Sequence, residues 1–346
     1  MTRSELPRAM PRSIPTGTIP LIAVEGTAYD CGRHYAEIVM EKYPGFREYL
    51  DMAYYWRDLP HPEKQLVEKR APHLLDLYRG LLEVAGPPGG GSATSPGGRC
   101  TSLGLSGSVT LDGQPISGQT KDTPLDRVPR YIVLRMRIED APTILVLAYP
   151  GEVMGYGMWS TGMTIFRNTL FSKAASTEGL SWVVFGLLAL AAHSVHEAAD
   201  LAMQYGCRGS GNLFLSDGSG ESLSIEMNIG GVSILPQKDG ILTHANHPEG
   251  EETRPYEAYP FKGAKEDSVY RMHGLWRLLD AERGRLTPQK VLMLLADHTM
   301  YPGGTCKHFS EDGAQTTAVV IAEPTQGRLH VVRGQPCCNW PVTYTL

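Results

Sequence analysis

The chain changes character at Cys100, and this change constrains the fold more than any other feature of the sequence. Before Cys100, the pattern predicts a short strand and a long amphipathic helix in "IPLIAVEGTAYDCGRHYAEIVMEK", then a second helix in "PEKQLVEKRAPHLLDLYRGLLEVAG". A Gly/Ser/Pro-rich run, residues 87–98, ends directly against Arg99 and Cys100. After Cys100, most segments have the alternation of apolar and polar or small residues that is typical of strands.

The segment after Cys100 predicts paired strands, with helices in separate blocks. Asp112-Gly113 separates two strand-like runs and indicates a hairpin. Further strands are expected in residues 131–151, 155–170, 211–248 and 316–336, and helices in residues 181–206, 267–284 and 287–298. Runs of strands and blocks of helices favour an α+β fold, with sheets packed face to face and helices outside.

Composition excludes several classes of protein. At 346 residues and 42% hydrophobic content, the chain can bury a large core in one or two domains. The net charge of −5, without a Lys/Arg-rich run, argues against a nucleic-acid partner. The N-terminal residues lack the apolar region of a signal peptide, and the longest apolar run, residues 182–192, is too short to cross a bilayer. The sequence therefore predicts a soluble, cytoplasmic protein without a membrane partner, and leaves its oligomeric state open.

The six cysteines do not form a recognisable disulfide framework, and only Cys100 lies beside a feature that needs explanation. A cut between Arg99 and Cys100 would give Cys100 both a thiol and a free α-amine. An α-amine with a pKa of roughly 7.7–8.0 can accept the thiol proton, so one residue would supply nucleophile and base. The alternative is that Cys100 is a small buried residue at the start of a strand. Periodicity alone favours this alternative.

Several motifs follow one another in order from about Ile22 onward. They are "GTAYDCGRHYAEI", "RCTSLGL" with "GQPISGQTKD", "GMWSTGMTIFRN", "GNLFLSDGSGESLSIE", "GILTHANHP", "DSVYR" and "VVRGQPC". Together they resemble the isopenicillin N acyltransferase family, whose members are N-terminal-nucleophile (Ntn) hydrolases that cleave themselves before a cysteine. Each motif is weak alone, and the order and spacing carry the resemblance.

The resemblance implies a four-layer αββα Ntn-hydrolase fold with two stacked antiparallel sheets. Residues 1–99 would be a helical pro-segment that ends in the Gly/Ser/Pro loop, and residues 100–346 the catalytic segment, together forming one globular domain. Cys100 would be the nucleophile, released by self-cleavage after Arg99. Asp122 would orient its amine and thiol, the Asn246 side-chain amide would stabilise the tetrahedral oxyanion, and Arg271 would lie near the site.

The resemblance also suggests pocket residues and shows where this chain departs from the family. Four residues are expected to contact the substrate: Gln119, Thr120, Trp159 and Asn168. Thr120 stands where the acyltransferases carry Asn, and Lys121 where an aromatic residue is common, so the substrate stays open. Arg99 replaces the usual Gly before the nucleophile. Because glycine permits strained backbone, this replacement makes slow or absent cleavage an alternative.

A metal site is a competing interpretation of the histidines and cysteines. His244 and His247, with Cys306 and His308, could imitate a zinc site, but their spacing matches no standard closed site. We therefore expect these residues to have packing roles, and predict neither a metal nor a cofactor.

The sequence thus predicts a self-processing cysteine hydrolase or acyltransferase. It would act on a small-molecule amide through a thioester on Cys100, with an acyl-CoA or an amine acceptor left open as a second substrate. The alternative function is an unprocessed, catalytically weak binding or scaffold protein of the same fold, which Arg99 supports.

Overall fold

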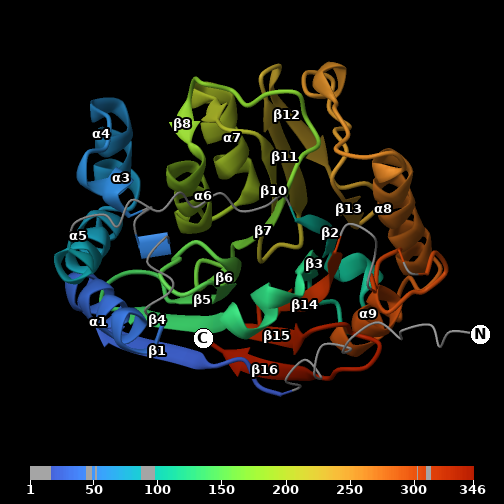
Figure 1. Cartoon of the computed structure of the whole chain (residues 1–346), viewed down its shortest axis with the longest axis horizontal. Helices are drawn as coiled ribbons and strands as arrows, with labels where there is room; N and C mark the ends of the chain where they lie inside the picture. The colour runs from blue at the N-terminus through green and yellow to red at the C-terminus, as the bar shows by residue number, and fades with distance from the viewer. Residues whose placement is uncertain (1–16, 44–48, 51–52, 87–97, 302, 309–312) are drawn as a thin grey trace, which may run out of the picture.

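The computed structural model describes residues 17–43, 49–50, 53–86, 98–301, 303–308 and 313–346 (Figure 1). The Gly/Ser/Pro loop at 87–97 and the first 16 residues of the predicted pro-segment lie outside the described residues.

Two large sheets dominate the structure. The eight-stranded sheet has the order β1 (Leu21–Gly26), β4 (Ile132–Ile138), β5 (Ile144–Ala148), β6 (Tyr156–Trp159), β7 (Thr164–Asn168), β10 (Gly211–Ser216), β11 (Ser222–Asn228), β12 (Gly231–Pro236). The six-stranded sheet has the order β13 (Ile241–His244), β2 (Arg99–Leu105), β3 (Ile116–Pro124), β14 (Ala314–Glu323), β15 (Arg328–Arg333), β16 (Pro341–Thr345). A short pair joins β8 (Leu180–Ser181) to β9 (Cys207–Arg208).

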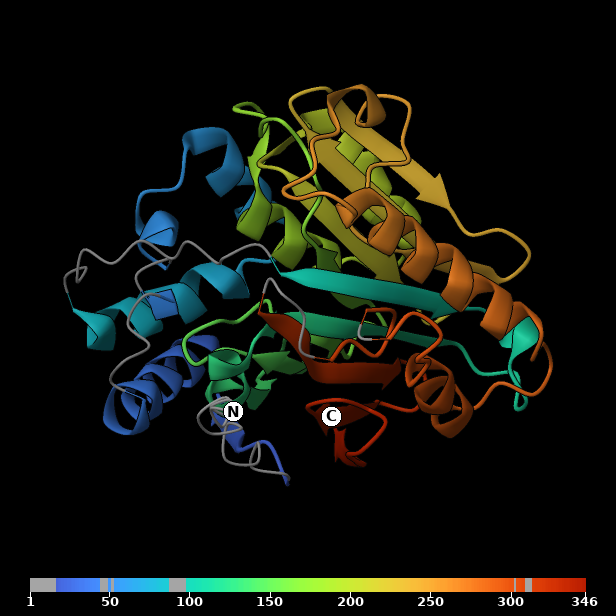
Figure 2. The same ribbon diagram turned by 45° about the vertical axis from the view of Figure 1, so that its right-hand side comes forward.

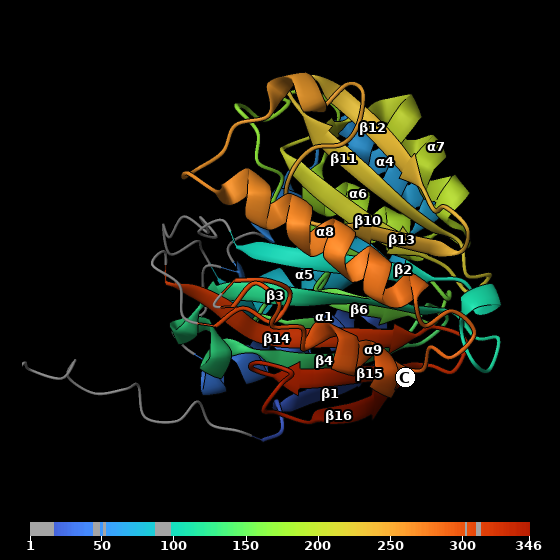
Figure 3. The same cartoon turned by 90° about the vertical axis from the view of Figure 1, so that its right-hand side faces the viewer.

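Helices cover the outer faces of both sheets. The eight-stranded sheet carries α1 (Ala28–Lys42), α4 (His61–Arg70), α5 (His73–Ala85), α6 (Trp182–Ala191) and α7 (Val195–Tyr205), with the short α3 (Tyr54–Arg57). The six-stranded sheet carries α8 (Ala264–Asp280) and α9 (Pro288–Leu295), and Figure 3 shows α8 running across β13 and β2. None of the helices in the described ranges combines the length and apolarity needed to span a bilayer.

Strand alternation explains the layers. In β4, Ile132 and Leu134 face the helices, whereas Val133 faces the other sheet. In β14, Val320 packs between the sheets and Ile321 packs under α8 and α9. Successive side chains of a strand point to opposite faces, so each sheet buries both of its faces. The predicted αββα arrangement is therefore confirmed.

Two details differ from the sequence expectation. One long helix was expected in "PEKQLVEKRAPHLLDLYRGLLEVAG", but it divides into α4 and α5 at Ala71 because Pro72 restricts the residue before it and lacks an N–H donor. Strands β2 and β3 do pair as expected, although Leu105 lies opposite Ile116, so the connection is longer than a two-residue turn at Asp112-Gly113.

The first strand also departs from the antiparallel expectation. β1 pairs in parallel with β4, with Leu21 opposite Val133, at one edge of the larger sheet. The chain between the two strands passes through helices α1 to α5 and then through β2 and β3 of the other sheet, so it is long enough for the crossover that parallel pairing requires. Residues before Arg99 therefore contribute a strand to the same sheet as residues after it.

Candidate active site

Cys100 is the second residue of β2, the teal strand that runs through the middle of the molecule in Figure 2. It is 4% exposed and lies on the wall of a cavity of about 350 Å³. Lys121, Tyr156 and Asn168 line the same cavity, from β3, β6 and β7. The cavity therefore reaches between the two sheets, with the thiol at its wall.

Asn246 and Arg271 hold the main chain of Cys100. The Cys100 N–H donates to Asn246 Oδ1 (3.2 Å), and the Cys100 carbonyl accepts from Arg271 Nη1 (2.8 Å). Arg271 Nη2 also donates to Asn246 Oδ1 (2.8 Å). The structure thus brings together three predicted residues that are far apart in the sequence. The oxygen of the Asn246 amide, rather than its nitrogen, faces Cys100, and Nδ2 donates to the Thr169 carbonyl (2.8 Å).

Arg271 is held by a line of charges in which Arg271 and Lys307 are buried and Asp267 is partly buried. Its Nε donates to Asp267 Oδ2 (3.0 Å), one turn earlier in α8, and Lys307 Nζ lies 3.1 Å from Asp267 Oδ1. Burial alone would raise the pKa of Asp267, but Arg271 and Lys307 hold it below its usual value. Arg271 is fully buried, so removal of Asp267 would leave a costly uncompensated charge beside Cys100.

Asp122 lies on β3, opposite Arg99 in the strand register and next to Lys121, which is opposite Cys100. Its Oδ1 accepts from Thr316 Oγ1 (2.7 Å), and its Oδ2 has no hydrogen-bond partner among the described residues. Burial raises the pKa of Asp122, against the opposing effects of Arg271 and Lys307. Arg99 itself is buried, with its guanidinium carbon 4.2 Å from the centre of the Phe261 ring.

The thiol sits in a buried environment with positive charge nearby. Burial raises the pKa of Cys100, and the ammonium group of Lys121 and the guanidinium of Arg271 oppose that rise. Lys121 Nζ is 3.2 Å from the centre of the Tyr156 ring, and burial lowers its pKa. In the sequence, Lys121 stands out only because it occupies a position where the family commonly has an aromatic residue. Strand alternation could have placed it with Cys100, because the two are opposite in register.

Asn168 lines the cavity, and one end of its side-chain amide is unpaired. Its Oδ1 accepts from Ser102 Oγ (2.9 Å) and from Asn212 Nδ2 (3.1 Å). Its Nδ2 is buried and has no partner among the residues that the structure describes. Gln119 Nε2 donates to Ser102 Oγ (2.9 Å), which completes a chain of donors that fixes the Asn168 oxygen. Asn168 thus lines the cavity beside Cys100 with a side-chain amide nitrogen that has no hydrogen-bond acceptor in the described part of the chain.

Three of the predicted pocket residues lie elsewhere. Gln119 does not line the cavity; it donates to Ser102, which in turn donates to Asn168. Thr120 does not line the cavity either, and its buried Oγ1 has no partner in the described part of the chain. Trp159 is completely buried among the residues that pack under the helices of the larger sheet.

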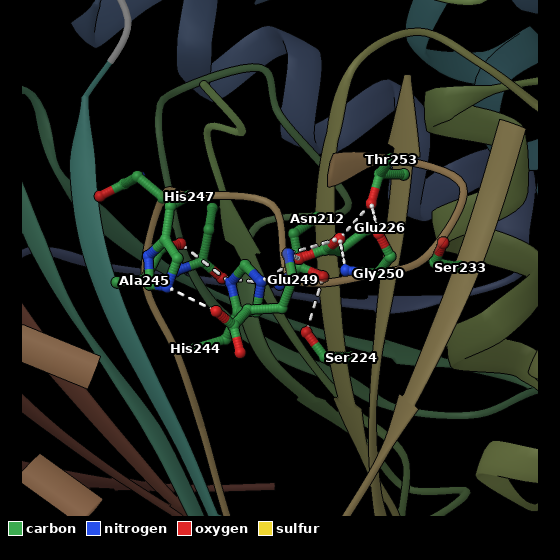
Figure 4. Close-up of polar contacts among 12 residues, drawn as sticks. Asn212, Ser224, Glu226, Ser233, His244, Ala245, His247, Glu249, Gly250 and Thr253 are labelled. Atoms are coloured by element: carbon green, nitrogen blue, oxygen red, sulfur yellow. Dashed lines mark hydrogen bonds and ion pairs between the residues drawn. The ribbon is translucent and has the colours of Figure 1, made fainter. Parts of the chain in front are cut away.

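The loop that carries Asn246 is anchored by Glu226 on β11, as Figure 4 shows. Glu226 accepts from the N–H groups of Glu249 and Gly250 and from the Thr253 hydroxyl, and its Oε1 lies 2.7 Å from His244 Nε2. Burial alone would raise the pKa of Glu226, but these contacts, with His244 first, hold it below its usual value. A buried carboxylate with this many donors stays ionised, and it fixes the turn after Asn246.

A sequence model of the family described as acyl-coenzyme A:6-aminopenicillanic acid acyl-transferase matches residues 110–337. The matched range contains Asp122, Asn168, Asn246 and Arg271, and it begins after Cys100. No curated protein matches the chain.

Among solved structures, a mutant conjugated bile acid hydrolase from Clostridium perfringens has a TM-score of 0.48 and 11% identity, covering 71% of this chain and 97% of the other. A second variant of that hydrolase has a TM-score of 0.46 and 12% identity, covering 71% and 97%. Penicillin V acylase from Agrobacterium tumefaciens has a TM-score of 0.45 and 12% identity, covering 70% and 84%.

Proposed function

Because the chain belongs to the acyl-coenzyme A:6-aminopenicillanic acid acyl-transferase family, we propose that it cuts itself before Cys100 and then cleaves or transfers the acyl group of a small-molecule amide through a thioester on that residue. Membership confirms the predicted family of Ntn hydrolases and the enzyme class, an amide hydrolase or acyltransferase. The observation that carries the proposal is the pair of contacts that Asn246 and Arg271 make to the main chain of Cys100 at the cavity wall.

Processing begins when the Cys100 sulfur attacks the carbonyl carbon of Arg99. The C–N bond breaks, the nitrogen of Cys100 takes a proton, and a thioester joins the two residues. Water then cleaves the thioester, leaving a carboxylate on Arg99 and a free α-amine on Cys100. In this proposal residues 1–99 are the pro-segment and residues 100–346 the catalytic chain.

In turnover, the α-amine of Cys100 takes the thiol proton, and the thiolate forms a C–S bond to the substrate carbonyl. Collapse of the tetrahedral intermediate breaks the C–N bond, and the ammonium returns the proton to the leaving amine. Water or an acceptor amine next attacks the thioester, and the thiolate leaves. Asn246 Oδ1 already accepts the N–H of Cys100, so it would hold the amine on the correct side of the sulfur.

Asn168 is the best placed oxyanion donor. Oxyanion stabilisation needs a fixed donor that is free to meet the developing negative charge. Asn168 lines the cavity with Cys100 and its Nδ2 has no partner among the described residues, whereas Asn246 Nδ2 already donates to Thr169. The motif predicts Asn246 as this donor. One of its two side-chain N–H groups is engaged by Thr169, so only the other could contribute to oxyanion stabilisation.

The cavity defines the substrate class. A volume of about 350 Å³ suits a small molecule rather than a folded protein. Tyr49, Tyr149 and Tyr156 offer aromatic surface to an acyl group, and Lys121 offers a positive charge. An acyl-CoA donor or an amine such as 6-aminopenicillanic acid would serve as the second substrate of a transferase.

A partition experiment tests the thioester. A panel of acyl p-nitroanilides first identifies an accepted acyl group, and the same acyl group is then supplied as its CoA ester. With 6-aminopenicillanic acid as acceptor, both donors should give the same ratio of acylated amine to free acid, because both pass through one acyl-enzyme. Different ratios would argue against a common thioester. A chain that stays uncut and turns over none of the donors would favour the unprocessed scaffold alternative.

Asn246→Asp tests whether Asn246 positions the amine. A carboxylate beside the α-ammonium should raise the pKa of the amine above its ordinary value of roughly 7.7–8.0, so less free amine is present at neutral pH. The acid limb of kcat/KM should therefore move upward by about one pH unit. Asn246→Ala, which adds no charge, should lower the rate without that upward shift. If Asn246→Asp lowers kcat equally at every pH, its role is confined to the oxyanion.

A further inference from the structure

Four His and Cys side chains, residue types that can ligate a metal, converge outside the active site. His298 follows α9, Cys306 and His308 lie in the segment 303–308, and Cys337 follows β15. Their ligand atoms all lie within 4.8 Å of one another. We propose that these four residues form a closed zinc site, which neither the sequence spacing nor the family membership assigns.

The distances fit a shared ion better than separate hydrogen bonds. His308 Nε2 lies 3.0 Å from His298 Nε2, 3.4 Å from Cys337 Sγ and 3.7 Å from Cys306 Sγ. One imidazole nitrogen offers either one N–H or one lone pair, so it cannot satisfy three such partners by hydrogen bonding. Tetrahedral zinc with bonds of about 2.0 Å to nitrogen and 2.3 Å to sulfur places its ligand atoms roughly 3.3–3.8 Å apart. The three separations from His308 Nε2 approximate this range, and the other pairs lie within 4.8 Å.

The ligand set specifies the metal and its role. Two thiolates with two imidazoles make a Cys₂His₂ set, which favours zinc over hard cations such as magnesium or calcium. Four protein ligands leave no open position for water or substrate, so the site is structural. Cys338, the neighbour of Cys337, is not part of it: its Sγ contacts the Gln335 carbonyl at 3.8 Å.

The site would fasten a segment that supports the active site. Lys307 lies between two of the ligands, Cys306 and His308, and its side chain is buried against Asp267. Asp267 in turn bonds Arg271, which holds the Cys100 carbonyl. Metal binding would therefore fix the segment 303–308, which places Lys307 beside Asp267 and Arg271.

The test measures metal content in the full chain, purified under reducing conditions and dialysed against limiting zinc. We expect about one zinc per chain for the wild type and for Cys338→Ser, and less than about one tenth of that for Cys306→Ser, Cys337→Ser and His298→Ala. Chelation should lower the melting temperature of the wild type, and zinc should restore it. Cobalt added to the chelated wild type should give thiolate-to-metal charge-transfer absorption, which tests the ligands even if a variant fails to fold.

Three results would overturn the proposal. The first is folded, reduced wild type that binds no stoichiometric zinc or cobalt. The second is zinc retained in folded Cys306→Ser and Cys337→Ser. The third is a disulfide between Cys306 and Cys337 in protein that takes up no zinc after reduction, which would make the pair a redox link instead.

Discussion

Replacing Cys100 with alanine is expected to abolish both self-cleavage and turnover. The sulfur is the proposed nucleophile in both reactions, and loss of a nucleophile costs on the order of 10⁵-fold or more in kcat. The fold should persist, because the change removes one buried sulfur and costs about 1 kcal/mol. The measurements are a denaturing gel for the cut, kcat with the accepted amide, and the melting temperature.

Cys207→Ala is the matched control for this variant. Cys207 is 2% exposed, as deeply buried as Cys100, but it packs in the helix-side core and does not line the cavity. It should lower the melting temperature and leave cleavage and kcat intact. If Cys100→Ala is still cut at Arg99–Cys100 or turns over normally, Cys100 is not the nucleophile.

Replacing Asn168 with alanine should lower kcat by roughly 10²–10³, the cost of removing one oxyanion donor. KM should change little, because the interaction forms mainly in the transition state. Cleavage before Cys100 passes through a similar intermediate, so it should slow as well. The measurements are kcat and KM of the processed variant and the time course of the cut.

Asn228→Ala provides the control for a buried asparagine. Asn228 is fully buried and donates to the Thr253 carbonyl (2.8 Å), away from the cavity. Its loss should cost stability while kcat of the folded protein stays unchanged. If Asn168→Ala behaves in the same way, the oxyanion donor must be sought at Asn246.

The sequence predicted the layers well because alternation is a local property. Val133 and Ile132 can be assigned to opposite faces of β4 from their neighbours alone. The break at Pro72 was equally local and could have been predicted. The parallel pairing of β1 with β4 could not, because register between distant strands depends on the whole sheet.

Prediction of the site residues depends on the order of the family motifs, because hydrophobic periodicity alone does not bring distant residues together. Cys100 and Arg271 are 171 positions apart, and only the resemblance placed them together before the structure did so. The motif could not show which atom of the Asn246 amide faces Cys100, nor that Gln119 supports Asn168 instead of the substrate. Those roles depend on side-chain orientation, which follows from packing across the two sheets.

Sequence spacing does not predict the cluster of His298, Cys306, His308 and Cys337. Cys306 and His308 were noted with His244 and His247, but the structure places them with His298 and Cys337. Spacing rules describe ligands carried on one short loop or finger. A site built from the end of a helix, a loop and the end of a strand has no such signature.

The most direct test of the central claim is the intact mass of the purified wild-type protein. The mass is measured before the addition of an accepted amide, and again after the reaction with that amide is rapidly quenched. We expect two chains, residues 1–99 and 100–346, with N-terminal sequencing of the larger chain beginning at Cys100. The quenched sample should show the larger chain heavier by one acyl group, attached to the Cys100 sulfur. A single uncut chain, a cut at another bond, or an acyl group on a different residue would contradict the assignment of Cys100 as an N-terminal nucleophile.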